Sequence, residues 1–271
     1  MQDVFLKFIS WFCIKETKKT SNFYRHCIEF SEIVAIVFFW NIVGTLETKN
    51  SGNPRQIGIT IPPLKDVSPK YKSWESVEQL TDVLLLVLTD EEFLSCYAFL
   101  RNVFKSSINE RVYFGEIGDC QKKVTISLVR SSRGCDQVQN VVKNAVAVLK
   151  PKAVFSVGCC AGLQKKQAQL GDVVISATLL TCGDKKTVND KPQWDGRRLD
   201  VSAKIRCLIK SAADGWRPPL KDPEARDVKV HRNAEILSGV ELVNSPNECE
   251  QLLDQFPEAI AIELEGQGEC Y

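Results

Sequence analysis

The segment FPEAIAIELEG, residues 256–266, combines an apolar strand pattern with two carboxylates. Its apolar residues predict a strand over 259–264. Glu263 and Glu265 are two residues apart, so in a regular strand they lie on one face, with Leu264 on the other. Two carboxylates on one face repel each other unless a ligand or a donor group separates them. The segment therefore has two interpretations, a binding site at a strand end or a strand end with both acids in water.

Upstream of this segment, short apolar runs alternate with amphipathic stretches. The runs at 82–88, 153–157 and 171–177 predict buried strands. Further strands are expected at 112–117 and 123–129, and helices at 136–149, 198–213 and 246–256. A helix after Thr89 is expected to carry Phe93, Tyr97, Leu100 and Phe104 at helical spacing. This alternation favours an α/β fold with three layers, a mostly parallel central sheet and helices on both faces.

The composition limits the classes of function. The 271 residues are 44% hydrophobic and 25% charged, which is typical of a globular protein with one large domain and an extension. A net charge of +1 without a Lys/Arg-rich stripe gives no basis for a nucleic-acid partner. Eleven scattered cysteines without a Cys-x-x-Cys pattern, with only two histidines, favour reduced thiols in a cytoplasmic protein over disulfides or a metal site.

The N-terminal third differs from the rest. We expect an apolar N-terminal extension over 1–46, a polar linker with four prolines over 47–79, and the main domain over 80–271. The apolar run from Ile33 to Leu46 is shorter than the roughly 20 residues that a helix needs to span a bilayer. It is predicted to be an appendage that packs poorly alone or is covered by a partner. A membrane anchor is the alternative.

Two other strand ends carry residues suited to a site, because ligands of such sheets bind beyond the carboxyl ends of strands. Thr89-Asp90-Glu91-Glu92 follows the first strand, and it also suits the charged start of a helix. Gly158-Cys159-Cys160-Ala161-Gly162 follows strand 153–157, and its small residues let backbone N–H groups approach a ligand. A tight turn filled by the two cysteines is the alternative.

Together these segments resemble the nucleoside phosphorylase superfamily, in the branch of the methylthioadenosine/S-adenosylhomocysteine nucleosidases. The matching segments are TDEE at 89–92, VGCCAGL at 157–163, LGDVVIS at 170–176, Ser238-Gly239 before Leu242-Val243, and the segment 256–266. The last is the most specific, close to the family's Phe-Pro-x-Ala-x-Ala-x-Glu-Met-Glu. The resemblance covers residues 80–271 and implies cleavage of the N-glycosidic bond of a purine nucleoside.

The resemblance assigns roles to individual positions. Glu265 matches the glutamate that holds the ribose hydroxyls, and Leu264 replaces the methionine that packs against the ribose. Leu242 stands where nucleosidases often have a base-stacking phenylalanine, and Val243 offers its backbone to the purine edge. Glu92, or Glu91 in a slipped register, matches the general base that activates water. The remaining expected substrate-binding residues are Gly158, Cys159, Ala161, Gly162 and Glu263.

The resemblance also bears on the reaction. Phosphorylases of this superfamily commonly carry Arg two residues before the Gly of the turn and Ser or Thr just after it, where this chain has Ser156 and Cys159. Without that planar cation a main phosphate ligand is lost, which favours hydrolysis. Arg130 or Arg133 is the alternative ligand. Phosphate is expected as a co-substrate only for a phosphorylase, and no cofactor is expected.

The family carries a further strand, a proton-donating aspartate and a helix beyond the position of Tyr271. The resemblance thus implies a C-terminally truncated domain that binds nucleosides but cleaves them poorly. A non-catalytic nucleoside-sensing or interaction module is the alternative function. Because the family often completes sites across subunit interfaces, a homo-oligomer is expected.

Overall fold

The computed structural model describes residues 34–39, 61–67, 70–72, 81–106, 112–118, 123–131, 135–163, 168, 172–182, 185–188, 191–194, 197–214, 228–239 and 246–263. Its helices are α2 (Asp90–Tyr97), α3 (Cys135–Leu149), α4 (Ala203–Ser211) and α5 (Pro246–Gln255), with a 3-10 turn, η1, at Leu64–Asp66. Its strands are β1 (Val34–Phe39), β2 (Lys70–Lys72), β3 (Val83–Val87), β4 (Arg101–Ser106), β5 (Val112–Gly118), β6 (Lys123–Arg130), β7 (Ala153–Cys159), β8 (Ala161–Gly162), β9 (Val173–Cys182), β10 (Lys185–Val188), β11 (Lys191–Trp194), β12 (Arg198–Asp200), β13 (Val230–Gly239) and β14 (Ala259–Glu263).

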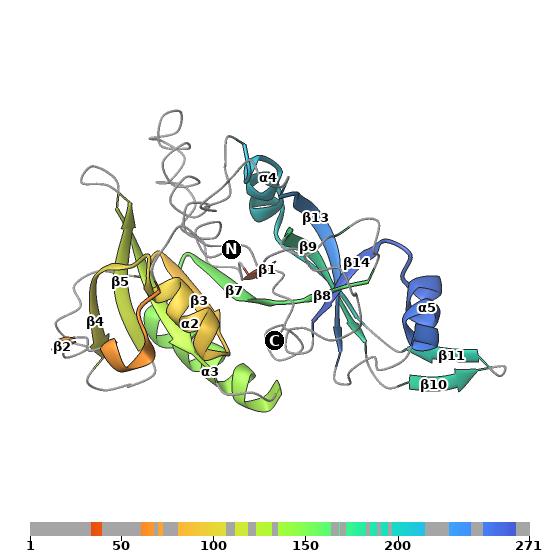
Figure 1. The fold of residues 1–271 in the computed structure, drawn as a ribbon, viewed down its shortest axis with the longest axis horizontal. Helices are drawn as coiled ribbons and strands as arrows, with labels where there is room; N and C mark the ends of the chain where they lie inside the picture. The colour runs from red at the N-terminus through yellow and green to blue at the C-terminus, as the bar shows by residue number, and fades with distance from the viewer. Residues whose placement is uncertain are drawn as a thin grey trace.

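One large sheet organises these elements. Its strand order is β2-β4-β5-β6-β3-β7-β1-β9-β13-β14-β8, with β12 paired to β9, while β10 and β11 form a separate hairpin. In Figure 1, β7 runs from the left-hand group of strands towards the right-hand group and leads into β8. Because β8 follows β7 in the chain and pairs with β14, it connects the end of β7 to the far edge of the sheet.

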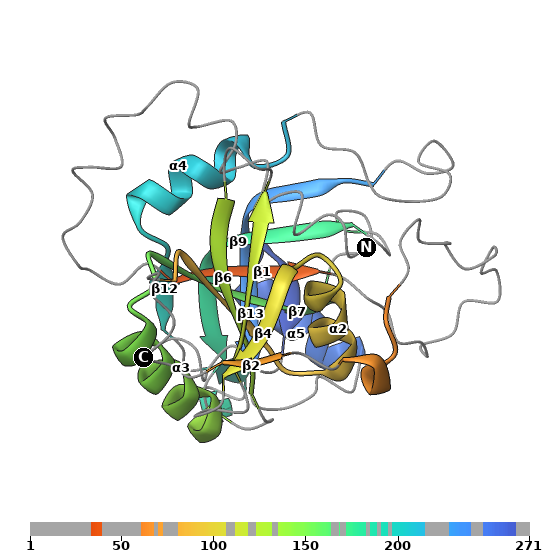
Figure 2. The same ribbon diagram turned by 90° about the vertical axis from the view of Figure 1, so that its left-hand side faces the viewer.

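The alternating side chains of β3 show how the layers form. Val83, Leu85 and Val87 pack in one cluster with Phe93 of α2, whereas Leu84 and Leu86 pack in another with Val142 of α3. Since successive strand residues face opposite sides of a sheet, α2 and α3 cover opposite faces. Figure 2 shows the two helices on either side of the strands between them. The predicted α/β class with helices on both faces is confirmed.

The sheet is mixed. Parallel pairing links β6, β3 and β7, as the sequence predicts for buried apolar strands. It also joins β7 to β1, and β13 to both β9 and β14. Antiparallel pairing joins β4 to β5, β5 to β6 and β1 to β9. Parallel pairs outnumber antiparallel ones in the large sheet, in agreement with the prediction.

Two predicted helices are shorter than expected. Helix α2 ends at Tyr97, and Phe104 lies in β4, where its ring stacks on that of Phe114 in β5 at 5.1 Å between centroids. The predicted helix over 198–213 starts instead as strand β12, and α4 begins after Ser202, whose hydroxyl accepts a hydrogen bond from the Ile205 N–H at 3.3 Å. Cross-strand pairing and the Ser202 cap override helical periodicity in these places.

Part of the predicted N-terminal extension lies inside the main sheet. Strand β1 pairs in parallel with β7, from Val34 opposite Val154 to Phe39 opposite Cys159, and antiparallel with β9. Strand β2, in the predicted linker, pairs with β4. The predicted boundary at residue 80 therefore does not separate the main sheet from what precedes it. Among the described residues, no helix is both long and apolar enough to cross a membrane.

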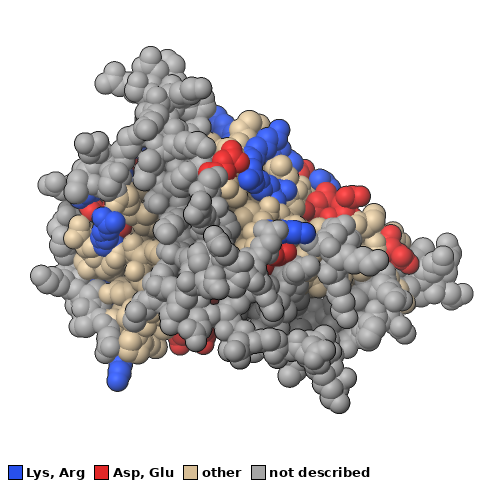
Figure 3. All heavy atoms as spheres, turned by 45° about the horizontal axis from the view of Figure 1, so that its top comes forward, with Lys and Arg blue, Asp and Glu red and all other residues tan. Residues whose placement is uncertain are grey.

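The charges of the described surface are mixed. On the face in Figure 3, basic and acidic side chains lie interspersed, without a field of one sign. This distribution agrees with the net charge of +1.

Gly115 allows β5 to pack closely against the chain that leads into β4. A Cβ atom at position 115 would lie 2.9 Å from Cβ of Leu100 and 3.3 Å from the Arg101 carbonyl oxygen. We expect Gly115→Ala to destabilise the protein by about 1–3 kcal/mol, the usual cost of overpacking. Urea unfolding measures this loss of stability. Ala145→Gly, at a half-buried position of α3, serves as a helix control and is expected to cost about 1 kcal/mol. A Gly115→Ala variant as stable as the native protein would contradict the close contact.

Candidate functional site

Glu92 is fixed at the end of β3 by a capping box. Its Oε2 accepts hydrogen bonds from the Leu88 and Thr89 N–H groups, both at 2.9 Å, while Thr89 Oγ1 accepts one from the Glu92 N–H at 3.2 Å. Glu92 is buried, whereas Glu91 is exposed. Of the two registers considered for a general base, only Glu92 thus has a side chain in the interior at this strand end. The same side chain also stabilises the start of α2.

The small-residue segment Gly158–Gly162 runs from the end of β7 into β8 and connects two parts of the sheet. Gly158 and Cys159 are the last residues of β7, and Ala161 and Gly162 form β8. Gly162 pairs with Ala261 of β14 and Ala161 with Ile262. The Leu163 N–H donates a hydrogen bond to the Ile260 carbonyl at 3.0 Å, extending the pairing.

This pairing places Glu263 beside the turn. Glu263 follows Ile262, whose partner is Ala161, so it lies level with Cys160. Burial raises the pKa of the Cys160 thiol, and the neighbouring Cys159 and the Glu263 carboxylate raise it further. Cys160 therefore stays protonated and acts as a small apolar residue, while Cys159 is exposed.

Glu92 lies at the start of α2, which follows β3, and β3 is the neighbour of β7. Strands β3 and β7 pair in parallel with Leu86 opposite Ser156, so Leu88, two residues on, is level with Gly158. The Leu88 N–H is one of the two groups that donate to the Glu92 carboxylate. The structure thus brings Glu92 to the end of β3, next to the strand that carries Gly158 and Cys159. It also places Ala161 and Gly162 of β8 beside the end of β14, where Glu263 lies.

The other predicted site residues are Leu242, Val243, Leu264 and Glu265, and they lie outside the described residues. Their predicted roles stay predictions. The last described residues before them are Gly239, which ends β13, and Glu263, which ends β14, and these two strands are parallel neighbours.

Ser238 belongs to this region, although it was not among the predicted site residues. It is fully buried and lies opposite Glu263 in the parallel pair of β13 and β14. The Ser-Gly pair at a strand end was visible in the sequence. Only the strand pairing shows that it adjoins Glu263.

Arg130, the alternative phosphate ligand, is engaged by an acid. It is the last residue of β6, opposite Val87 of β3, and its guanidinium forms an ion pair with Asp90 at the start of α2. Arg133 lies outside the described residues. An arginine whose charge is balanced by Asp90 is a weaker phosphate ligand than a free one.

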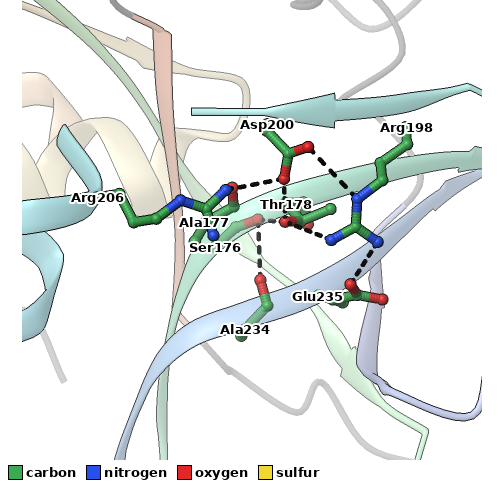
Figure 4. Close-up of polar contacts among 8 residues, drawn as sticks. All are labelled: Ser176, Ala177, Thr178, Arg198, Asp200, Arg206, Ala234 and Glu235. Carbon is green, nitrogen blue, oxygen red and sulfur yellow. Dashed lines mark hydrogen bonds and ion pairs between the residues drawn. The ribbon is translucent and has the colours of Figure 1, made fainter. Parts of the chain in front are cut away.

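A second polar cluster lies between β9, β12, β13 and α4 and was not predicted. Figure 4 shows Arg198 between Asp200 and Glu235, with Arg206 on the other side of Asp200. Arg198 Nη1 lies 2.6 Å from Glu235 Oε1, and Arg206 Nη2 lies 2.8 Å from Asp200 Oδ1. Thr178 Oγ1 donates to Asp200 Oδ1 at 2.6 Å. This network joins β12 and α4 to the sheet. No local sequence pattern indicates it, because Thr178 and Glu235 are far from Arg198 and Asp200 in the chain.

The cluster predicts an acid-sensitive contribution to stability. The hydrogen bond from Thr178 lowers the pKa of Asp200, and Arg206 and Arg198 lower it further. The folded pKa is thus below the ordinary 3.8, so the stabilisation is present above that pH and is lost as pH falls through the folded pKa. Because Asp200 is half exposed, Asp200→Asn should cost less than about 1 kcal/mol at pH 7. Urea unfolding at pH 7 and pH 3 measures the difference, which should shrink at pH 3. An equal difference at both values would contradict this assignment.

The described residues contain no group of three or more His, Cys, Asp or Glu side chains placed to hold a metal ion.

Comparison with known proteins decides the family. The model of the phosphorylase superfamily matches residues 91–270, most of the chain. The chain belongs to the phosphorylase superfamily. This match confirms the family predicted from the sequence, and it contains the turn and β14.

A curated protein is also similar to the chain. A death domain-containing ATP nucleosidase of Amphimedon queenslandica is 26% identical to the chain over an alignment of 212 residues. The match covers 68% of this chain and 39% of the relative. The chain thus spans about two fifths of the length of this curated relative.

Solved structures show the same fold. The 5′-methylthioadenosine/S-adenosylhomocysteine nucleosidase from Neisseria meningitidis has a TM-score of 0.51 and 20% identity, over 70% of this chain and 78% of that chain. The S-adenosylhomocysteine nucleosidase from Streptococcus pyogenes has a TM-score of 0.52 and 18% identity, over 70% and 77%.

Proposed function

We propose that the chain binds a purine nucleoside where the Gly158–Gly162 turn meets β14, and cleaves its N-glycosidic bond by hydrolysis. The observation that carries this proposal is the pairing of Ala161 and Gly162 with Ile262 and Ala261, which sets Glu263 beside the turn. Membership of the phosphorylase superfamily and the similarity to a relative named as an ATP nucleosidase support the choice of substrate class.

Each part of the site has a chemical task in this proposal. Cleavage passes through a transition state with positive charge on the ribose, which nearby carboxylates stabilise. Glu265 holds the ribose hydroxyls through charge-assisted hydrogen bonds, and Leu264 forms an apolar wall. Leu242 and Val243 contact the base, and the turn offers backbone N–H groups. Glu92 acts as general base and takes a proton from the attacking water. The water oxygen bonds to the ribose C1′ as the C1′–N bond breaks, and the base leaves as an anion that takes a proton from solvent.

Hydrolysis is preferred over phosphorolysis on two grounds. Ser156 is neutral where phosphorylases carry a cation, and Arg130 is paired with Asp90. Phosphate would otherwise need a free, planar cation as a ligand. We propose no cofactor and a cytoplasmic homo-oligomer.

A second function, nucleoside sensing without cleavage, is favoured by one observation. The Leu88 and Thr89 N–H groups, just before α2, both donate to the same oxygen of Glu92, so this carboxylate has a structural task that does not require catalysis.

A product assay separates these functions. The purified chain is incubated with methylthioadenosine, adenosine, inosine and ATP, with and without phosphate, and free base is measured by chromatography. Base release that does not need phosphate supports the hydrolase. Release only with phosphate, together with ribose 1-phosphate, would replace it by a phosphorylase. Saturable nucleoside binding in calorimetry without any release would replace it by the sensor, and neither binding nor release would overturn the proposal.

A further inference from the structure

Strand β1 fills a gap in the middle of the sheet. Its six residues pair in parallel with β7, and Val37 to Phe39 also pair antiparallel with β9. Within the described residues, β7 and β9 have no direct pairing with each other, and β1 is the strand that joins them. Both halves of the sheet therefore rely on a segment that is far away in the sequence from either neighbour.

The position of β1 matters most at the end of β7. Strand β3 pairs with β7 only from Ala153 to Ser156. The last three residues of β7 are Val157, Gly158 and Cys159, and they pair with Val37, Phe38 and Phe39. In the described part of the chain, Gly158 and Cys159 thus have β1 as their strand partner.

An unpaired end of β7 would be poorly defined. Glycine loses more backbone entropy on ordering than any other residue type, so ordering the backbone at Gly158 is costly. The N–H and C=O groups of a strand also need hydrogen-bond partners when they are buried. Pairing with β1 satisfies these groups and restricts the backbone. The same pairing covers the edge that β9 would otherwise expose.

We propose that the N-terminal segment Val34–Phe39 is a positioning strand of the nucleoside site, which holds the Gly158–Cys159 end of β7, from which β8 leads to its pairing with β14. The apolar run of the N-terminal segment is then part of the domain's working structure. Its effect on ligand binding rests on the proposed nucleoside function, whereas its place in the sheet does not.

Hydrogen exchange on the full chain tests the place of β1. Amides of residues 35–39 should exchange more than about 100-fold slower than in an unstructured peptide, as expected for a paired central strand. Exchange at the unprotected rate would overturn the inference, whether or not nucleosides bind.

A variant pair tests the positioning role. Val37→Pro removes a backbone N–H from the middle of β1, and Ser51→Pro is the control in the proline-containing segment. Val37→Pro should speed exchange at Val157–Cys159 and weaken methylthioadenosine binding at least about 10-fold, with β5 and β6 still protected. Val37→Gly keeps the N–H and replaces Val37→Pro if that variant does not fold. If neither exchange at Val157–Cys159 nor affinity differs from the control, the inference is overturned. If the native chain binds no nucleoside, the proposed function fails, and the exchange at Val157–Cys159 still decides this inference.

Discussion

Replacement of Glu92 by glutamine should slow the release of free base about 10²–10⁴-fold, the usual effect of losing a general base. The physical reason is that this carboxylate has two separate tasks, accepting backbone hydrogen bonds in the capping box and taking a proton from water. A glutamine oxygen still accepts hydrogen bonds from the Leu88 and Thr89 N–H groups, so the capping box persists. The amide cannot take a proton from water. Initial rates with methylthioadenosine, thermal unfolding and calorimetric binding should show lower kcat with unchanged stability and affinity.

Glu91→Gln is the matched control, because Glu91 is adjacent and exposed. It should leave the rate unchanged. Equal rates for Glu92→Gln and the native chain would exclude Glu92 as general base and leave it only the capping role. A large loss in Glu91→Gln instead would move the role to the slipped register.

Replacement of Glu265 by glutamine should raise the Kd for methylthioadenosine about 100-fold. Two ribose hydroxyls that donate to a carboxylate form charge-assisted hydrogen bonds, each stronger than its amide counterpart. Isothermal titration calorimetry measures the affinity. Glu258→Gln, exposed just before β14, serves as the control and should bind as the native chain does.

An unchanged Kd in Glu265→Gln would contradict the ribose-binding role. A loss of thermal stability in this variant that matches the loss of affinity would point instead to a structural task for this carboxylate.

Local patterns predicted the elements that local forces determine. The apolar runs became β3, β7 and β14, and Thr89 with Glu92 formed the capping box that their spacing indicates. Periodicity failed at Phe104, where stacking on Phe114 in the neighbouring strand favours β4. Propensity alone does not report such a contact, because its partner lies in another strand.

Long-range pairing was the part that the sequence left undetermined. The apolar run around Val34–Phe39 predicts an appendage that packs poorly alone or is covered by a partner, and nothing in its residues indicates that β7 and β9 are its neighbours. Likewise, no pattern in the sequence indicates that Asp200 contacts Thr178 and Arg206. The adjacency of the turn and β14 followed from the family resemblance, and the structure supplied the register that puts Glu263 level with Cys160.

The location of a bound nucleoside tests the central claim most directly. A crystal structure of the full chain with methylthioadenosine would show it. We expect the nucleoside to contact both the Gly158–Gly162 turn and the end of β14 at Glu263. A nucleoside bound elsewhere, with this junction unoccupied, would contradict the account.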